Sequence, residues 1–264
     1  PSAAGTQRSA NGVLTVNSTS LPVMISNPNG SIEVTGVSGK TIEASLDFEV
    51  SASSRAEEKE LADAILLRLM SERDGYHIEV SIPKLSDPQT QILRNVLVVS
   101  VPPGLRLYCR GAYGDVSISD LTGSVEATTG YASMDISDCS GGVKAVNSFG
   151  SLSLSDCTGN ITAQNSYAGL ELSNCSGTIS AVNAYAPISI SDSRGSVDVR
   201  NTGEISITDH IGPVSISNQY GSVTVSDVKG DVSIQNAYQE ISVENIDGKV
   251  QLENNYSPIS VSGI

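Results

Sequence analysis

Apolar residues recur along the second half of the chain in pairs separated by one polar residue, and successive pairs start nine residues apart. The first members of the pairs are Leu107, Val116, Val125, Met134, Val143, Leu152, Ile161, Leu170, Ile179, Ile188, Val197, Ile205, Val214, Val223, Val232, Ile241, Val250 and Ile259. One residue is missing between Val197 and Ile205. Such alternation predicts short β-strands with one buried face, joined by turns of Gly, Asn and Asp. A fixed period over so many copies indicates a solenoid.

The turns between these strands are of two kinds, which alternate, so the true period is eighteen residues. One kind begins with Asp or Asn and ends with Gly, as in Asp156-Cys157-Thr158-Gly159. The other contains Asn, a small residue and an aromatic residue, as in Asn165-Ser166-Tyr167. We therefore expect an all-β fold, a single-chain parallel β-solenoid (β-helix or β-roll) whose coils each hold two strands and two unlike corners.

Stacked coils place equivalent residues about 4.8 Å apart, so like side chains form ladders. At one corner we expect Asp or Asn to cap its own turn, with Gly supplying a positive φ. Stacked Asn side chains are also expected to bond along the ladder.

The first hundred residues carry the same rhythm less regularly, with Leu14, Val23 and Ile32 nine residues apart. The one good helix signal runs from Ser54 to Ser71, with an apolar face made by Leu61, Ala64, Ile65, Leu67 and Leu69. We predict a disordered or extended N-terminus over residues 1–12, and first coils over 13–106 with a helix inserted at 54–72. The helix would cap the stack, and residues 107–264 would form the regular solenoid of one continuous domain.

Charge and hydropathy disfavour some classes of binding partner for this chain. The formal net charge is −14, and without a basic stripe the chain has nothing to neutralise phosphates, so nucleic-acid binding is not expected. The same charge disfavours docking on anionic lipid. No run of 18 apolar residues occurs, so we expect no membrane insertion in this segment. The polar start from Pro1 to Asn11 is typical of a mature or trimmed chain, from which a signal or anchor has been removed.

Three segments resemble a known family. They are the turn and strand from Asn27 to Val34, the helix with its Glu-rich start, and the Gly-Asp-Val-Ser-Ile type repeats at Gly114–Ser119 and Gly230–Ile234. In these the chain resembles the bacterial β-strand-repeat proteins of unknown function that are labelled putative adhesins. The resemblance implies an exported or membrane-attached protein, hence an extracytoplasmic location in the periplasm or on the cell surface. It brings no catalytic residue with it.

Cysteine and aspartate each recur at the Gly-ended corner. Cys139, Cys157 and Cys175 hold one position in three successive coils. A straight line of ligands cannot converge on one zinc, so we expect small buried filler, with one strained disulfide as the alternative. The aspartates of the same corners are Asp120, Asp138, Asp156, Asp192, Asp209 and Asp227. Calcium-binding β-rolls need a Gly-Gly-x-Gly-x-Asp repeat, which this corner lacks, so turn capping is expected and no metal site is predicted.

The other corner carries an aromatic ladder, made of Tyr113, Tyr131, Phe149, Tyr167, Tyr185, Tyr220, Tyr238 and Tyr256. The ladder is interrupted where Asn201-Thr202-Gly203 is one residue short. Such rings either pack a corner for stability or form a platform for a sugar or peptide. If they form a platform, the candidate binding face consists of Tyr167, Tyr185, Tyr220, Tyr238 and Tyr256.

The function expected from these features is that of a non-enzymatic structural or adhesion-type β-solenoid of the envelope or cell surface, presenting a repetitive face to a protein or glycan. The alternatives are a sensor or regulatory module of an envelope-stress system and a carbohydrate-active β-helix enzyme. The enzyme is disfavoured because the turns are too uniform to wall a cleft and because His77 and His210 are the only histidines. No catalytic residue and no cofactor are predicted. The last strand, with Ile259 and Val261, also suggests a tail-to-tail homodimer.

Overall fold

The computed structural model describes residues 5–85 and 87–264, in which short β-strands joined by tight turns predominate, and the chain falls into two compact units, Pro1–Thr129 and Gly130–Ile264. Each unit has two walls of strands connected coil by coil. The all-β solenoid predicted from the sequence is confirmed.

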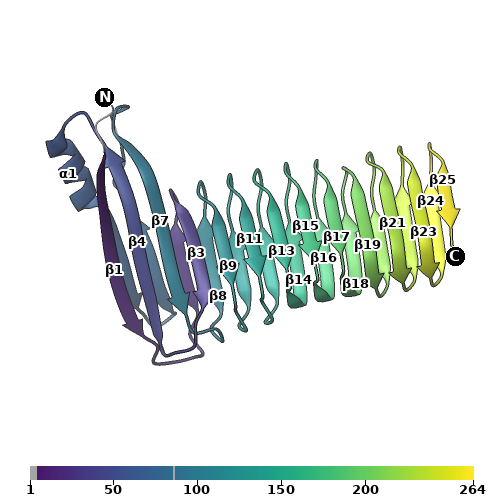
Figure 1. Cartoon of the computed structure of the whole chain (residues 1–264), viewed down its shortest axis with the longest axis horizontal. Helices are drawn as coiled ribbons and strands as arrows, with labels where there is room; N and C mark the ends of the chain where they lie inside the picture. Colours follow the sequence, from purple (N-terminus) through teal and green to yellow (C-terminus); the bar gives the residue numbers. More distant parts are fainter. Residues whose placement is uncertain (1–4, 86) are drawn as a thin grey trace. The chain divides into compact units, whose positions relative to one another are not determined.

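The second unit is the regular one, and its strands are stacked in parallel (Figure 1). One wall consists of β11 (Met134–Ser137), β13 (Leu152–Ser155), β15 (Leu170–Ser173), β17 (Ile188–Ser191), β19 (Ile205–Ile211), β21 (Val223–Lys229), β23 (Ile241–Asp247) and β25 (Ile259–Ser262). The other consists of β12 (Val143–Val146), β14 (Thr158–Gln164), β16 (Ser176–Val182), β18 (Arg194–Arg200), β20 (Val214–Ser217), β22 (Val232–Asn236) and β24 (Val250–Asn254).

Strand register confirms the eighteen-residue coil. Leu152 pairs with Leu170, eighteen residues further on, and Val223 pairs with Ile241 at the same interval. Across the short corner Ile188 pairs with Ile205, an interval of seventeen, so the missing residue is absorbed within the corner and the strands stay aligned. The paired Val, Ile, Leu and Ala side chains point between the walls and are buried from β11 to β23, while the Ser, Thr and Glu residues between them face outward. In β25 the pair Ile259 and Val261 is exposed.

In the first unit the spatial order of the strands differs from their order in the sequence. One wall runs β1 (Thr6–Thr15), β4 (Thr41–Ser51), β7 (Gln91–Val101), β3 (Ser31–Gly36) and β9 (Val116–Ser119). The other runs β5 (Leu66–Ser71), β6 (Tyr76–Ser81), β2 (Val23–Asn27), β8 (Leu107–Gly111) and β10 (Val125–Thr128). The β1–β4, β4–β7 and β5–β6 pairs are antiparallel, and the others are parallel. The coil of β2 and β3 therefore lies between two coils that follow it in the chain.

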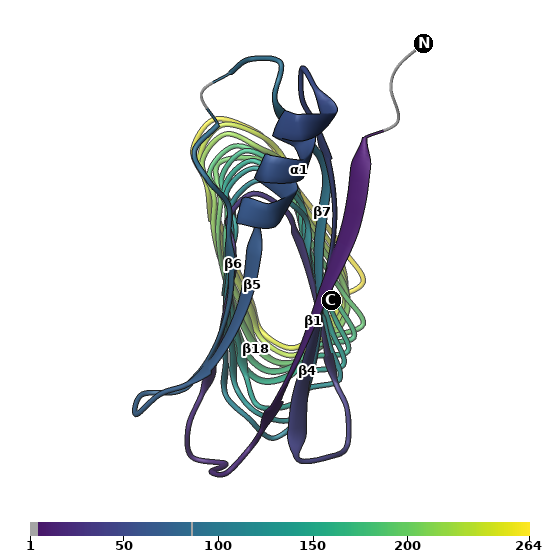
Figure 2. The same ribbon diagram turned by 90° about the vertical axis from the view of Figure 1, so that its left-hand side faces the viewer.

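The helix is shorter than the sequence predicted. Helix α1 spans Arg55–Ala64, with Ser54 as its N-cap, and residues 66–71 form strand β5 instead of the predicted last turns (Figure 2). The prediction of a helix from Ser54 to Ser71 was wrong over this second part. The Leu-Leu-Arg-Leu-Met-Ser segment also alternates, and its antiparallel pairing with β6 satisfies the backbone groups of both strands.

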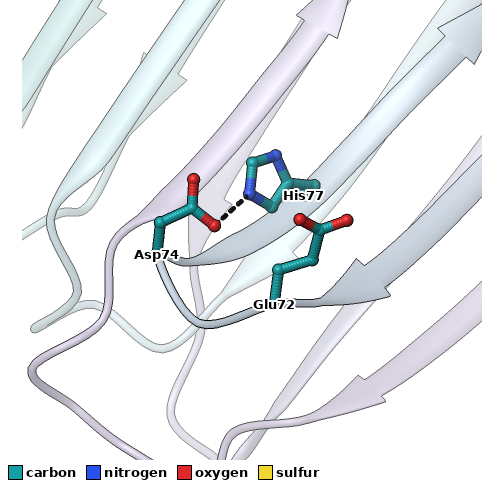
Figure 3. A group of neighbouring side chains, drawn as sticks. All are labelled: Glu72, Asp74 and His77. Carbon is teal, nitrogen blue, oxygen red and sulfur yellow. Dashed lines mark hydrogen bonds and ion pairs between the residues drawn. The ribbon is translucent and has the colours of Figure 1, made fainter.

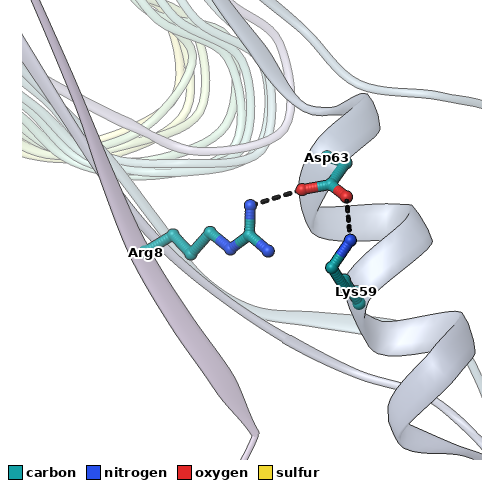
Figure 4. Close-up of polar contacts among 3 residues, drawn as sticks. All are labelled: Arg8, Lys59 and Asp63. Atoms are coloured by element: carbon teal, nitrogen blue, oxygen red, sulfur yellow. Dashed lines mark hydrogen bonds and ion pairs between the residues drawn. The ribbon is translucent and has the colours of Figure 1, made fainter.

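Helix α1 packs on β1 and β4 through the buried side chains of Leu61 and Ala62. Polar contacts fix its position. Thr6 Oγ1 donates a hydrogen bond to Glu58 Oε2 over 2.9 Å, and Asp63 bridges Arg8 of β1 and Lys59 of its own helix (Figure 4). Hydrogen bonds from Lys59 and Arg8 hold the pKa of the Asp63 carboxyl below its usual range.

Candidate functional site

The aromatic ladder lies at the surface. All eight side chains are exposed, between 45% for Tyr238 and 72% for Tyr256. Seven of them belong to the second unit, and Tyr113 belongs to the first. Because large aromatic side chains normally bury most of their area, a row of exposed rings is the feature of this chain that most suggests a binding surface.

Within the second unit the rings form two face-to-face stacks. Tyr131, Phe149, Tyr167 and Tyr185 make one stack, and Tyr220, Tyr238 and Tyr256 make the other. Neighbouring ring centroids lie 4.8–5.2 Å apart with interplanar angles of 2–18°. A ring inside a stack has both faces covered by its neighbours, so it offers solvent only its edge and, for tyrosine, its hydroxyl group.

Buried asparagines form the base of each aromatic corner. The Nδ2 atom of Asn165 donates to the carbonyl oxygens of Gly150, Ala168 and Gly169 at 2.9–3.1 Å, and its Oδ1 accepts from the Ser166 N–H at 2.9 Å. Gly150 belongs to the preceding coil, so one side chain ties two coils together. In the second unit backbone carbonyls take the amide hydrogens, so the expectation that stacked Asn side chains bond to one another was wrong for these corners. In the first unit Asn27 and Asn95 do bond to one another, each Nδ2 donating to the other's Oδ1 over 3.1 Å.

The two stacks are separated by the short corner, Asn201-Thr202-Gly203. Asn201 Nδ2 still donates to Ala186 O at 3.0 Å and to Glu204 O at 3.1 Å, and Gly221 N donates to Thr202 O at 3.0 Å. The corner is therefore bonded to the preceding coil through Asn201 and to the following coil through Thr202. It has no aromatic residue.

The opposite corners owe their shape to a left-handed backbone at the Asp or Asn itself. These residues have φ between 50° and 61°, namely Asp120, Asp138, Asp156, Asn174, Asp192, Asp209, Asp227 and Asn245. Asp and Asn adopt this region more easily than other non-glycine residues. Their side chains are exposed, and Asn174 and Asn245 donate to Asp156 and Asp227 of the preceding coil. From the sequence we predicted a positive φ only for the glycines of these corners.

The cysteine column is buried, as predicted. Cys139, Cys157 and Cys175 are thiols with no more than 1% of their surface exposed, and each donates its S–H to a carbonyl oxygen two residues earlier. Burial raises the pKa of the Cys109 thiol, in strand β8, to about 12. A hydrogen bond with the Cys139 thiol is the main cause that raises the pKa of Cys157 to about 12. These thiols fill space and are poor nucleophiles.

His210 occupies the same buried column where the next coil has Val228. Its Nε2 lies 3.0 Å from the Gly195 carbonyl oxygen, whereas its Nδ1 has no hydrogen-bond partner in the described chain. Burial lowers the pKa of this imidazole below its ordinary value.

The hairpin between β5 and β6 holds a cluster that the sequence reasoning missed. Ligand atoms of Glu72, Asp74 and His77 all lie within 4.8 Å of one another, and His77 Nε2 lies 3.1 Å from Asp74 Oδ1 (Figure 3). Their spacing around a tight turn was the available signal. The hydrogen bond to His77 lowers the pKa of Asp74. Both carboxylates are exposed, and exposed acidic groups gather in turns without a metal, so we assign none.

A shallow depression of about 550 Å³ lies on the outward face of the β16–β24 wall, lined by residues that include Ser180, Asp198, Ser215 and Ser233. Asp198 is already paired with Arg200 over 3.2 Å. The depression is open, and its lining combines Ser and Asp side chains with apolar groups of Ile179, Val197 and Val214. It can form hydrogen bonds to a ligand but offers no ring to stack on.

The fold and the exposed ladder define a β-solenoid that presents a repeated aromatic edge. In residues 5–85 and 87–264 no helix has the length and hydrophobicity to cross a bilayer. No protein-family model and no curated protein matches the chain.

Solved structures resemble it weakly. A putative adhesin from Parabacteroides distasonis is 10% identical, with a TM-score of 0.43 over 97% of this chain and 98% of that one. A putative cell adhesion protein from Clostridium sporogenes is 11% identical, with a TM-score of 0.34 over 97% and 99%. A putative lipid binding protein from Parabacteroides distasonis is 12% identical, with a TM-score of 0.30 over 94% and 98%. The first two names agree with the resemblance seen in the sequence, but likeness at this level supports no argument about what this chain binds.

Proposed function

We propose that this chain is a non-enzymatic, extracytoplasmic binding module whose aromatic ladder contacts a protein or glycan partner. The observation that carries the proposal is the exposure of eight aromatic side chains in equivalent corners, each at least 45% exposed. Exposed aromatic rows are costly in a soluble protein unless a partner covers them, and aromatic residues dominate the energetics of recognition surfaces. Ring edges and tyrosine hydroxyls suit sugars and peptides alike.

The corners make the surface rigid before a partner binds. Within the second unit Phe149, Tyr167, Tyr185, Tyr238 and Tyr256 donate their backbone N–H to the preceding coil, as Tyr185 does to Ser166 O at 2.9 Å and Tyr238 to Gln219 O at 3.0 Å. Buried Asn amides bond the same corners from beneath. A surface held in this way loses little conformational entropy on binding, which favours affinity.

The test is a binding screen with a ladder variant. Tyr167, Tyr185, Tyr220, Tyr238 and Tyr256 are all replaced by Ser, and the protein is compared with the wild type on a glycan array and a peptide array. A control variant carries Val98→Ser, Leu93→Ser and Ile211→Ser, which removes exposed apolar area from residues that do not belong to the ladder. We expect the ladder variant to lose at least tenfold in affinity for any ligand found, and the control to keep it.

Thermal unfolding accompanies the screen, because the rings also contribute to stability. Unchanged binding by a folded ladder variant would show that the rings stabilise corners and do not contact partners.

A further inference from the structure

The short corner leaves two aromatic faces uncovered on either side of it. Tyr185 ends the first stack and Tyr220 begins the second, and each has a stacked neighbour on one side only. Their exposures reflect this. Tyr185 is 68% exposed against 56% for Tyr167, whose two faces are both covered, and Tyr220 is 55% exposed against 45% for Tyr238.

The separation of these two faces is set by the coil spacing. Rings in adjacent coils lie 4.8–5.2 Å apart, and one coil intervenes, so Tyr185 and Tyr220 are separated by roughly 10 Å between centroids. That is twice the ladder's own spacing. One further flat ring placed midway would meet both faces at the distance that the ladder uses everywhere else.

The base of the gap is short and partly polar. Between the two rings the short corner supplies Thr202, whose side chain is much shorter than a tyrosine, and Gly203, which has no side chain. Hydrogen bonds from Asn201 Nδ2 to Ala186 O and from Gly221 N to Thr202 O tie the short corner to the corners on both sides of it. The gap is thus pre-organised and does not depend on a ligand to open it.

Negative charge near the gap favours a ligand that carries positively charged residues beside its ring. Glu204, directly after the short corner, is exposed, and Arg200, before it, is already paired with Asp198 over 3.2 Å. The whole chain carries a formal charge of −14. Lysine or arginine next to the inserted ring would therefore be attracted, and acidic neighbours would be repelled.

We propose that the gap between Tyr185 and Tyr220 is a binding site for one aromatic side chain of a partner polypeptide, flanked by basic residues, which inserts as the missing rung of the ladder. The site rests on the proposed function and narrows it to an aromatic-basic peptide motif. A flat ring is preferred to a sugar ring, which is puckered and carries hydrogens on both faces, so it requires wider spacing than an aromatic stack provides.

The probe is the tripeptide Lys-Trp-Lys, with Lys-Leu-Lys as its control. Because the chain contains no Trp, tryptophan fluorescence reports on the probe alone. One sandwiched ring should give a dissociation constant in the millimolar range, with one site per chain. Lys-Leu-Lys should bind at least tenfold more weakly, and Tyr185→Ala and Tyr220→Ala should each reduce affinity for Lys-Trp-Lys by tenfold or more.

Two insertions test the geometry directly. A tyrosine inserted between Thr202 and Gly203 restores the regular corner and fills the gap, so binding should be lost. A serine inserted at the same place restores the length without a ring, so binding should remain. A further variant, Tyr238→Ala, opens a second gap between Tyr220 and Tyr256, so the stoichiometry should rise to two sites per chain. Because this result is a gain of binding, misfolding of the variant cannot produce it.

Retention of binding after the tyrosine insertion, or absence of Lys-Trp-Lys binding by the wild type, would overturn this site. The tyrosine insertion leaves every ladder residue in place. It is therefore also tested on any ligand that the wild type binds and the five-fold serine variant does not. If the tyrosine insertion leaves binding of that ligand unchanged, the gap proposal fails while the broader proposed function stands.

Discussion

His210 places an ionisable ring in a buried column whose neighbouring positions are filled by Ser193 and Val228. In the folded protein burial lowers the pKa of this imidazole, which favours its neutral form. In the unfolded chain a histidine titrates near pH 6.5, so below that pH the unfolded state binds the proton more readily. Stability contributed by the neutral ring is present above about pH 6.5 and is lost as the pH falls toward the folded-state pKa.

We therefore predict that the wild type loses more stability than His210→Val between pH 7.5 and pH 5. The difference should approach, at most, about 1.4 kcal/mol per pH unit over the interval in which only the unfolded state is protonated. Urea unfolding at the two pH values measures it. His77, beside Asp74 and Glu79, is present in both proteins, so its contribution cancels in the comparison. Parallel pH profiles for the two proteins would contradict the assignment.

The exposure of the aromatic rings could not be predicted from their spacing in the sequence. The spacing of the rings predicted a ladder, and stacks at 4.8–5.2 Å confirm it. Whether the rings pack inward or face solvent depends on the corner backbone. In this chain the inward position at the corner belongs to Asn183, only two residues before Tyr185, and it is buried while the ring is 68% exposed. No apolar-polar alternation encodes that choice.

At the scale of elements, the aromatic corners join strands of successive coils through their asparagines, and these corners are not equivalent. Asn165 makes three donor bonds and one acceptor bond. Asn218 donates only to Gly221 O, at 2.8 Å, and its Oδ1 is buried with no partner in the described chain. Both side chains are buried, so the comparison isolates hydrogen bonding from burial.

We predict that Asn165→Ala destabilises the protein by about 1–3 kcal/mol, because it leaves buried carbonyl groups without their donor. Asn218→Ala should cost less, since it removes one bond and one unsatisfied oxygen together. Urea denaturation of the two variants provides the measurement. An equal or larger cost at Asn218 would mean that side-chain packing, and not bonding between coils, explains the asparagine ladder.

Strand positions were predictable and strand order was only partly so. Inward pairs such as Val143 and Ile161 align because a shift of one residue would expose every apolar side chain. The insertion of β2 between β6 and β8 leaves no local trace, since all three carry the same alternating pattern and any could be adjacent. The helix was overextended for a related reason: residues 66–71 fit a helical face and a strand equally, and only the pairing with β6 decides.

At the scale of the whole molecule, the long rows of identical bonds suggest that unfolding spreads from coil to coil. Thr158 N donates to Cys139 O at 2.8 Å, and Ser176 N donates to Cys157 O at 2.9 Å, so three successive thiol-bearing corners are linked directly. In repeat proteins each coil is stabilised mainly by its neighbours, so linked coils open together. The three corner cysteines are natural reporters of this cooperativity.

We predict that all four thiols react slowly with iodoacetamide at pH 8 in the folded protein. The pKa values of Cys109 and Cys157 are raised to about 12, so at pH 8 almost none of either thiol is in the reactive thiolate form. All four side chains are also buried, so the reagent cannot reach them. With increasing urea, Cys139, Cys157 and Cys175 should become labelled at one shared midpoint, as measured by mass spectrometry of the labelled peptides. Cys157→Ser serves as the control: Ser193 already holds this position with a hydrogen bond to Ser191 O of 2.7 Å, so the loss of stability should be modest. Rapid labelling of any corner thiol without urea, or a midpoint for one of them distinct from the other two, would show that the coils open individually.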